Sequence, residues 1–267
     1  VGISYVSIAN ARENLEKEIG NRTFDEVYAT TRQTWNDALR ATVEGGTDDQ
    51  KTIFYTALYH ALIHPNLLND VNGDYPESKT NKIGKSNERY TVFSLWDTYR
   101  NYHQLLTLLY PEQQLQMVRT MLDIYKESGW LPKWELNSTE TFTMVGDPAS
   151  IVLADTYLRG LTDFDIQTAY EAMLKGANTL ENNPIRPGVK EYWKLGYLSV
   201  DGGVRGPVST TQEYNAADFA IAQIAKKLGK KADYEKFNQQ AYSYRKLFDK
   251  ETHLLRPCHA DGKWYAP

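Results

Sequence analysis

The densest group of residues that could do chemistry lies between residues 129 and 155. It contains two glutamates, Glu135 and Glu140, and the tryptophan Trp134. Periodicity is weak from 137 to 143, so we expect a loop between helices there. Such a loop could stack a sugar ring on Trp134 and present a carboxylic acid to it. On spacing alone, a glutamate that caps the following helix or lies in solvent is an equally good interpretation.

A second group lies in an expected helix that begins near residue 93. Trp96 and Arg100 are four residues apart, and Asp97 precedes Arg100 by three, which places an acid and a base on one helix face. An acid and a base beside a tryptophan can hold vicinal sugar hydroxyls through charge-assisted hydrogen bonds. A structural ion pair within a helical core is the competing interpretation, and the spacing by itself favours it.

Other catalytic and metal motifs are absent from the sequence or incomplete. There is no G-x-S-x-G, Walker loop, G-x-G-x-x-G or H-E-x-x-H. His60 and His64 have the spacing of a two-histidine metal site, but no glutamate lies between them. The segment from Asp70 to Asp74 resembles the start of a calcium loop, but its glycine is misplaced and the twelfth position lacks an acid. We therefore expect a tight polar turn there.

Composition limits the classes of partner. The chain has 267 residues and a net charge of −4, which argues against nucleic acid or an anionic membrane as the main partner. No run approaches the length of about 20 apolar residues that spans a bilayer, and mean hydropathy is −0.58. A single cysteine, Cys258, excludes an internal disulfide. The 19 tyrosines and 6 tryptophans offer flat faces with polar edges, which suit sugar rings.

The elements that must position these groups are almost all helical. Capping residues begin several of them: Thr23, Thr47, Asp147 before Pro148, Asp163 or Asp165, and a capping box at 209–212. Expected helices cover residues 8–19, 23–39, 47–64, 93–109, 112–127, 148–159, 165–175, 209–228 and 234–248. Strands are expected only at 1–6 and 254–255. Helix pairs joined alternately by short turns and long loops suit a toroid of paired helices. About nine helices are expected, so a ring of six pairs would be incomplete.

The motifs quoted so far, with several others, occur together in a known family. The sequence resembles glycoside hydrolase family 92, the exo-acting α-mannosidases. The resemblance rests on F-Y-T-A-L-Y-H at 54–60, D-V-N-G-D-Y at 70–75, S-L-W-D-T-Y-R at 94–100, L-P-K-W at 131–134, T-E-T-F-T-M-V-G-D at 139–147 and D-F-D at 163–165.

The resemblance implies a fold and a domain arrangement. The family's catalytic domain is an all-α, (α/α)6 toroid, of which residues 23–267 would form the N-terminal part. Residues 1–22 would be a linker into that toroid. A β-sandwich domain would lie upstream, and the C-terminal part of the toroid would follow residue 267.

The resemblance also implies a reaction and its residues. The expected reaction is removal of terminal α-linked mannose, with α-1,2 as the favoured linkage, from mannans or N-glycans with inversion. Glu140 falls on the family's general acid, although Thr139 stands where asparagine is common. Trp96 and Asp97 fall in the subsite for the terminal mannose, and Arg100 and Trp134 are further candidates for substrate binding.

Part of the family's machinery is expected outside this sequence. One calcium ion would hold the mannose 2- and 3-hydroxyls. The base aspartates and several calcium ligands would follow residue 267, so we assign no base and no metal ligand. Family members act in the periplasm or outside the cell. Two alternatives stay open: a carbohydrate-binding or scaffold fragment that does not cleave its ligand, and a calcium-independent toroidal glycosidase acting on α-glucosides.

Overall fold

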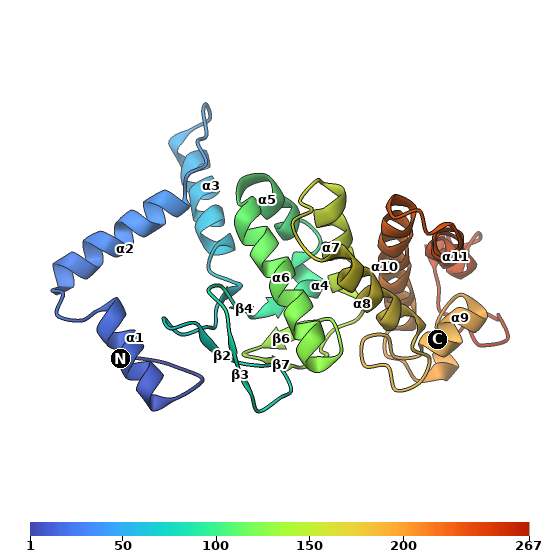
Figure 1. Cartoon of the computed structure of the whole chain (residues 1–267). Coiled ribbons are helices and arrows are strands. Elements are labelled where there is room, and N and C mark those ends of the chain that lie inside the picture. Colours follow the sequence, from blue (N-terminus) through green and yellow to red (C-terminus); the bar gives the residue numbers. More distant parts are fainter. Residues whose placement is uncertain (267) are drawn as a thin grey trace. The chain divides into compact units, whose positions relative to one another are not determined.

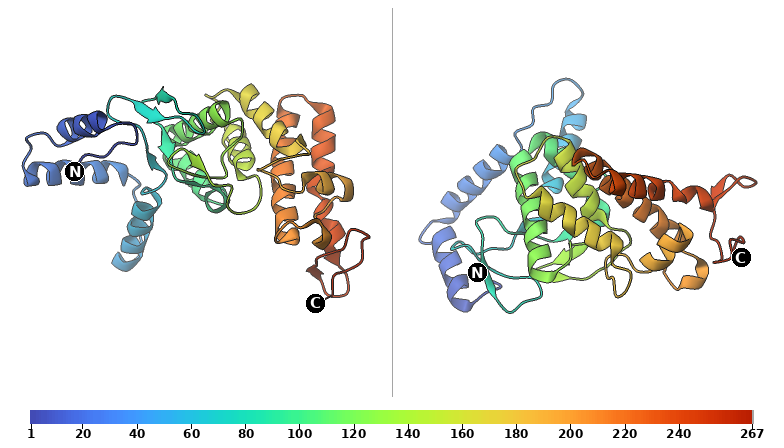
Figure 2. Two further views of the ribbon diagram at one scale, coloured as in Figure 1. Left: turned by 90° about the horizontal axis from the view of Figure 1, so that it is seen from below. Right: turned by 45° about the vertical axis from the view of Figure 1, so that its right-hand side comes forward.

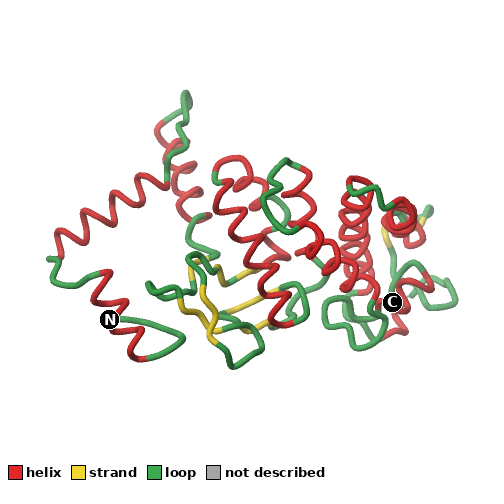
Figure 3. The backbone as a smooth tube through the Cα atoms, viewed as in Figure 1, coloured by secondary structure: helices red, strands yellow, loops and turns green. Residues whose placement is uncertain are grey.

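The computed structural model describes residues 1–266 and is predominantly helical, with α1 to α11 in this range (Figures 1 and 3). This confirms the helical class expected from the sequence. The chain divides into two compact units, Val1–Val92 and Phe93–Pro267. The strands are all two or three residues long, and they form sheets of two or three strands.

The first unit has three helices followed by two small antiparallel sheets. Strand β1 pairs with β4, and β2 pairs with β3. The elements are α1 (Ile8–Glu18), α2 (Phe24–Ala38), α3 (Asp48–Ala61), β1 (Asn66–Leu67), β2 (Asp74–Pro76), β3 (Ile83–Lys85) and β4 (Tyr90–Thr91).

Local capping explains where two of these helices begin. Thr23 and Glu26 exchange hydrogen bonds across the first turn of α2, and Thr47 and Gln50 do the same for α3. Both are capping boxes, which satisfy backbone N–H groups that a helix start leaves free. The two threonine caps expected from the sequence are therefore confirmed.

The turn at residues 70–74 holds the N-terminal segment in place. The Asp70 carboxylate accepts hydrogen bonds from Ser4 (2.7 Å), Asn10 (2.8 Å) and Asn14 (2.7 Å). Gly73 has a φ of +87° and its N–H donates to the Asp70 carbonyl, which closes a tight turn. The polar turn expected here is confirmed. The strand expected at residues 1–6 is wrong, because this segment is held by side chains rather than by a strand partner.

The second unit carries the five candidate site residues Trp96, Asp97, Arg100, Trp134 and Glu140. Its elements are β5 (Phe93–Ser94), α4 (Leu95–Thr98), α5 (Tyr102–Leu109), α6 (Pro111–Ser128), β6 (Trp134–Leu136), β7 (Thr139–Glu140), α7 (Pro148–Leu158), α8 (Ile166–Asn178), α9 (Val189–Leu195), η1 (Val200–Gly202), α10 (Pro207–Lys227), α11 (Lys231–Ala241), η2 (Ser243–Leu247), β8 (Phe248–Asp249) and β9 (Leu254–Leu255).

Helix α10 is the centre of packing in this unit. It packs along α11 and against α7, which Figure 2 shows from two further directions. Its inward residues are fully buried, among them Tyr214, Ile221 and Ile224. Helices α5, α6 and α7 also pack on one another. This pairwise packing agrees with the expected rhythm of helix pairs.

Several expected boundaries in this unit are wrong. The single helix expected at 93–109 is a strand and two helices, because Phe93 and Ser94 pair with strand β6. Helix α10 begins at Pro207 rather than in a capping box at 209–212, since Gly206 has a φ of +60° and proline suits the first helical position. Helix α9 lies within an expected loop, and the last expected helix ends early, at Ala241.

Candidate active site

A three-stranded antiparallel sheet brings the predicted site residues into one region. Strand β6 is central: Ser94 of β5 pairs with Trp134, and Glu135 pairs with Glu140 of β7. Helix α4, which carries Trp96 and Asp97, follows β5 directly. The segment expected to be a loop is therefore a hairpin, whose first strand pairs with β5 and whose second strand carries Glu140.

The turn of this hairpin has the left-handed backbone that tight antiparallel turns require. Asn137 and Ser138 have φ values of +48° and +64°. The buried Glu135 carboxylate accepts the Ser138 N–H at 2.5 Å. Glu135 is thus part of the turn, and it does not cap helix α7.

The Glu140 carboxylate is held by three backbone N–H groups. Its Oε2 accepts from Lys133 at 2.7 Å, and its Oε1 accepts from Trp134 at 3.0 Å and Phe142 at 2.7 Å. The side chain is half-buried. Hydrogen bonds to a carboxylate are charge-assisted, and three of them fix the orientation of this group. Neither of the two simple alternatives, a helix cap or a freely solvated carboxylate, describes Glu140.

Trp96 and Arg100 lie together, but the expected Asp97–Arg100 ion pair is replaced by other contacts. The Arg100 guanidinium lies 4.9 Å from the centre of the Trp96 ring. It forms its ion pair with Glu213 of α10, at 2.8 Å. The exposed Asp97 carboxylate accepts a short hydrogen bond from Ser94. Asp97 is consequently held by the strand that pairs with Trp134.

Lys133 places a buried cation beside Glu140. Its side chain is 1% exposed, and its Nζ donates to the Ile185 carbonyl at 2.6 Å. Burial lowers the pKa of Lys133 to about 8, although the nearby negative charges of Asp147 and Glu140 act in the opposite direction. The hairpin that carries Glu140 therefore lies near a buried cation whose charge is poorly solvated.

A fully buried ion-pair network lies next to Lys133. Arg186 donates to Asp147 at 2.9 Å and to Asp218 at 2.6 Å. Tyr192 also donates to Asp218, at 2.6 Å. Burial raises the pKa of Asp218 above its usual value, and the positive charge of Arg186 offsets only part of this effect. Asp147, expected as a helix cap, makes no capping hydrogen bond to α7 and instead binds Arg186.

The backbone after Glu140 is strained. Phe142 and Met144 have φ values of +52° and +68°, which bulky L-residues adopt only at a cost. Met144 is 48% exposed, so burial does not compensate for its conformation. Strained segments cluster at functional sites, and this one connects the candidate acid to Asp147 and the Arg186 network.

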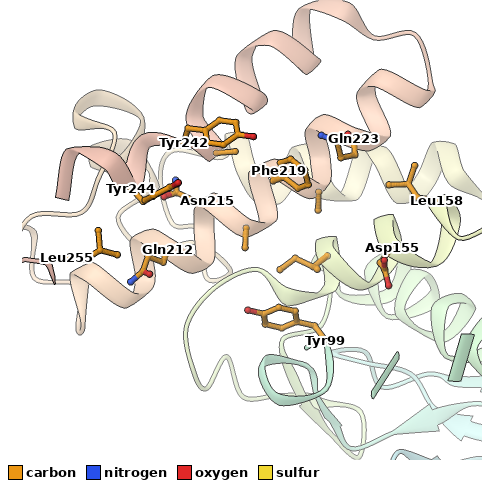
Figure 4. A pocket seen from close by; sticks show the side chains of 14 residues that line it. Tyr99, Asp155, Leu158, Gln212, Asn215, Phe219, Gln223, Tyr242, Tyr244 and Leu255 are labelled. Atoms are coloured by element: carbon orange, nitrogen blue, oxygen red, sulfur yellow. The ribbon is translucent and has the colours of Figure 1, made fainter. Parts of the chain in front are cut away.

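A separate apolar pocket of about 620 Å³ lies between α7, α10 and η2 (Figure 4). Phe219, Tyr242 and Leu158 contribute to it, and Tyr99 lies at one edge. Within residues 1–266, none of the five predicted site residues lines this pocket. The sheet that carries Glu140, rather than this apolar pocket, therefore defines the candidate site.

No calcium site is formed by the described part of the chain. Residues 1–266 contain no group of three or more histidine, cysteine, aspartate or glutamate side chains arranged to hold a metal. In the calcium-loop-like turn, Asp74 is bound by Lys85 at 2.6 Å and by Asn10, and Asp70 is occupied as described above. The carboxylates of this turn are therefore already bound by other side chains of the described chain.

None of the helices within residues 1–266 is long and apolar enough to cross a bilayer. Sequence reasoning did not identify Lys133, Arg186 or Glu213. The only signal for Lys133 was its place within L-P-K-W, and Arg186 and Glu213 lay in segments without a motif.

An oriented carboxyl group is one of the two that a glycoside hydrolase uses. The comparisons with known proteins give the particular family. Residues 10–267 match the model of the glycosyl hydrolase family 92 catalytic domain. The chain therefore belongs to glycoside hydrolase family 92.

Solved structures agree with this assignment. The chain is similar to the family 92 α-mannosidase BT3965 from Bacteroides thetaiotaomicron, with 37% identity and a TM-score of 0.92 over 99% of this chain and 35% of that one. It is also similar to the inverting mannosidase BT2199 from Bacteroides thetaiotaomicron VPI-5482, with 30% identity and a TM-score of 0.93 over 99% of this chain and 36% of that one.

A curated relative gives the same result in sequence. It is an uncharacterized secreted glycosidase from Arthroderma benhamiae, 28% identical over 99% of this chain and 33% of its own length. The chain thus spans about a third of the length of these relatives.

Proposed function

We propose that the longer protein that contains this chain is an exo-α-mannosidase that removes terminal α-linked mannose with inversion, and that Glu140 is its general acid. The observation that carries this proposal is the anchored Glu140 carboxyl group, fixed by three N–H donors on a hairpin next to Trp96. The family assignment and the mannosidase relatives support the substrate class.

An inverting glycosidase needs an acid on one side of the bond and a base that activates water on the other, about 6.5–9.5 Å apart. In our proposal this chain supplies the acid, and the base lies in the part of the protein outside it. The chain's coverage of about a third of its relatives supports this division. The description of BT2199 as an inverting mannosidase supports inversion.

The hydrogen bonds of Glu140 suggest which oxygen carries the proton. Each carboxyl oxygen has two acceptor positions. Within the described chain, Oε1 uses both for Trp134 and Phe142, whereas Oε2 uses one for Lys133. We therefore place the catalytic proton on Oε2. After transfer to the leaving oxygen, the three N–H groups stabilise the remaining carboxylate.

The neighbouring residues would hold the terminal mannose. We propose that Trp96 and Trp134 contact the sugar ring, while Asp97 and Arg100 bind hydroxyls. Asp97 and Arg100 are both exposed, so each can reach a ligand. A structure of BT3965 in complex with mannoimidazole, 37% identical to this chain with a TM-score of 0.91 over 99% of it, supports a mannose-like ligand.

Calcium is part of the proposal, with several of its ligands outside this chain. The described residues do not form such a site, so we assign none of them to the ion and derive no step from it. The remaining features are also proposals: an (α/α)6 toroid completed by other segments, an upstream β-sandwich, a preference for α-1,2-linked mannose in mannans or N-glycans, and a periplasmic or secreted location. The secreted relative supports the last of these.

The test is hydrolysis of α-1,2-, α-1,3- and α-1,6-mannobiose by the full-length protein, followed by proton NMR. We expect β-mannose as the first product, fastest from the α-1,2 isomer, with loss of activity in EDTA and recovery with calcium. Release of α-mannose would contradict inversion. Binding without cleavage would favour a carbohydrate-binding module, and cleavage of α-glucosides without calcium would favour the glucosidase alternative.

A further inference from the structure

Glu213 of α10, the Tyr99 hydroxyl and the Arg100 guanidinium form a closed ring of hydrogen bonds. Its Oε1 accepts from the Arg100 guanidinium at 2.8 Å, and its Oε2 accepts from the Tyr99 hydroxyl at 2.8 Å. Arg100 in turn donates to the Tyr99 oxygen at 2.9 Å. The Glu213 side chain is only 12% exposed. Figure 4 shows the Tyr99 hydroxyl directed toward the start of α10.

This ring fixes the plane of the Arg100 guanidinium over two aromatic rings. The guanidinium carbon lies 4.9 Å from the Trp96 ring centre and 4.7 Å from that of Tyr99. Without an anion on its far side, a long arginine side chain samples many rotamers. Two hydrogen bonds, one to Glu213 and one to Tyr99, restrict that freedom. Glu213 therefore acts on Trp96 through Arg100.

Glu213 also contacts the segment that carries the candidate acid. A Cβ added to Gly146 would lie 2.8 Å from the Glu213 Cβ and 3.3 Å from its Oε2. Gly146 has a φ of +91° and joins the strained segment after Glu140 to helix α7. Glycine is therefore required there both by the backbone conformation and by the close approach of Glu213.

We propose that Glu213 is a positioning residue for mannose binding, which sets Arg100 and Trp96 on one side and the Gly146 turn of the acid loop on the other. This inference rests on the proposed function, since it concerns the same sugar site. Glu213 touches no reacting atom in this account. Its removal should thus weaken substrate binding more than it slows bond cleavage.

Two variants of the full-length protein test this. Glu213→Gln keeps the shape and an acceptor for Tyr99 but loses the charge opposite Arg100. Glu213→Leu removes both. For mannobiose hydrolysis we expect KM to rise about tenfold in Glu213→Leu and less in Glu213→Gln, while kcat falls less than about threefold. Glu235→Gln, on the exposed face of α11, is the matched control and should leave both parameters unchanged.

A second measurement does not depend on activity. Burial, and then the negative charge of Glu213, raise the pKa of Tyr99 to about 12. The Tyr99 titration, taken as the difference between a protein and its Tyr99→Phe variant in ultraviolet absorbance, should move toward 10 in both Glu213 variants. It should stay in place in Glu235→Gln.

The outcomes separate this inference from the proposed function. If the parent protein does not cleave mannosides but the Tyr99 titration moves as expected, the mannosidase proposal fails and the ring of contacts stands. An unchanged KM in Glu213→Leu would overturn the positioning role. So would a Glu213→Gln variant in which kcat falls as strongly as KM rises. An unmoved Tyr99 titration would overturn the ring itself.

Discussion

The backbone N–H of Lys133 donates to Glu140 at 2.7 Å, while the buried ammonium group of the same residue donates to the Ile185 carbonyl at 2.6 Å. One residue thus orients the candidate acid through its main chain and brings a poorly solvated positive charge near it. These two interactions connect the hairpin that carries Glu140 to Ile185, which directly precedes Arg186 of the buried ion-pair network. The hairpin that carries Glu140 is therefore anchored to the packed interior of its unit.

Lys133 should make stability depend on pH in the alkaline range. Because its pKa is about 8 in the folded state and near 10.5 when unfolded, the unfolded chain binds the proton more tightly between these values. The contribution of Lys133 to stability should therefore improve as pH rises from 8 to 10, by up to about 3 kcal/mol. Urea unfolding at several pH values should show this rise in the wild type and lose it in Lys133→Met.

The control for that experiment is Lys194→Met, at an exposed position of α9. It should retain the wild-type dependence on pH. If Lys133→Met and the wild type have the same dependence, the buried ammonium does not titrate as the geometry requires.

Removing Arg186 should destabilise the protein strongly. Arg186→Met leaves Asp147 and Asp218 buried without their cation, and breaking a buried pair in this way typically costs about 3–5 kcal/mol. Adding Asp218→Asn to the variant should restore part of the loss, because one uncompensated charge is removed. Thermal unfolding measures both. Arg159→Met, which breaks an exposed pair with Asp155, should cost about 0.5 kcal/mol or less.

A loss in Arg186→Met as small as that in Arg159→Met would show that the network does not hold this part of the fold. So would a double variant less stable than the single one.

Because Met144 has a positive φ, we expect glycine to be more stable than alanine at this position, which is the reverse of their order within a helix. Both Met144→Gly and Met144→Ala remove the exposed side chain, but only glycine accepts a φ of +68° without steric cost. We expect the glycine variant to be the more stable of the two by up to about 1 kcal/mol in urea unfolding. At Glu171, an exposed position within α8, the same pair should show the opposite order by about 1 kcal/mol. The same order at both positions would contradict the strain.

Features that depend on a few consecutive residues were predictable from the sequence. Thr23 with Glu26, and Thr47 with Gln50, are separated by three residues and cap their helices as expected. The resemblance to family 92, which rested on short motifs, was confirmed. The role of Glu140 within one of these motifs stays a prediction. The tight turn at residues 70–74 also followed from local residue types.

Features that depend on distant pairing could not be predicted in the same way. The expected helix at 93–109 is interrupted because Ser94 pairs with Trp134, a register that no local pattern encodes. Arg186 meets Asp147 and Asp218 across 39 and 32 residues of sequence. Arg100 was expected to pair with its neighbour Asp97, and it instead pairs with Glu213, 113 residues away. Tertiary contacts of this kind override helical spacing.

The most direct test of the central claim compares Glu140→Gln with the wild type on two substrates of the full-length protein. For α-1,2-mannobiose, whose leaving oxygen needs a proton, kcat should fall about 10²–10⁴-fold. For an aryl mannoside with an acidic phenol as leaving group it should fall less than about tenfold, and the exposed control Glu171→Gln should match the wild type on both. Equal losses on the two substrates, or no loss on mannobiose, would contradict a general-acid role for Glu140.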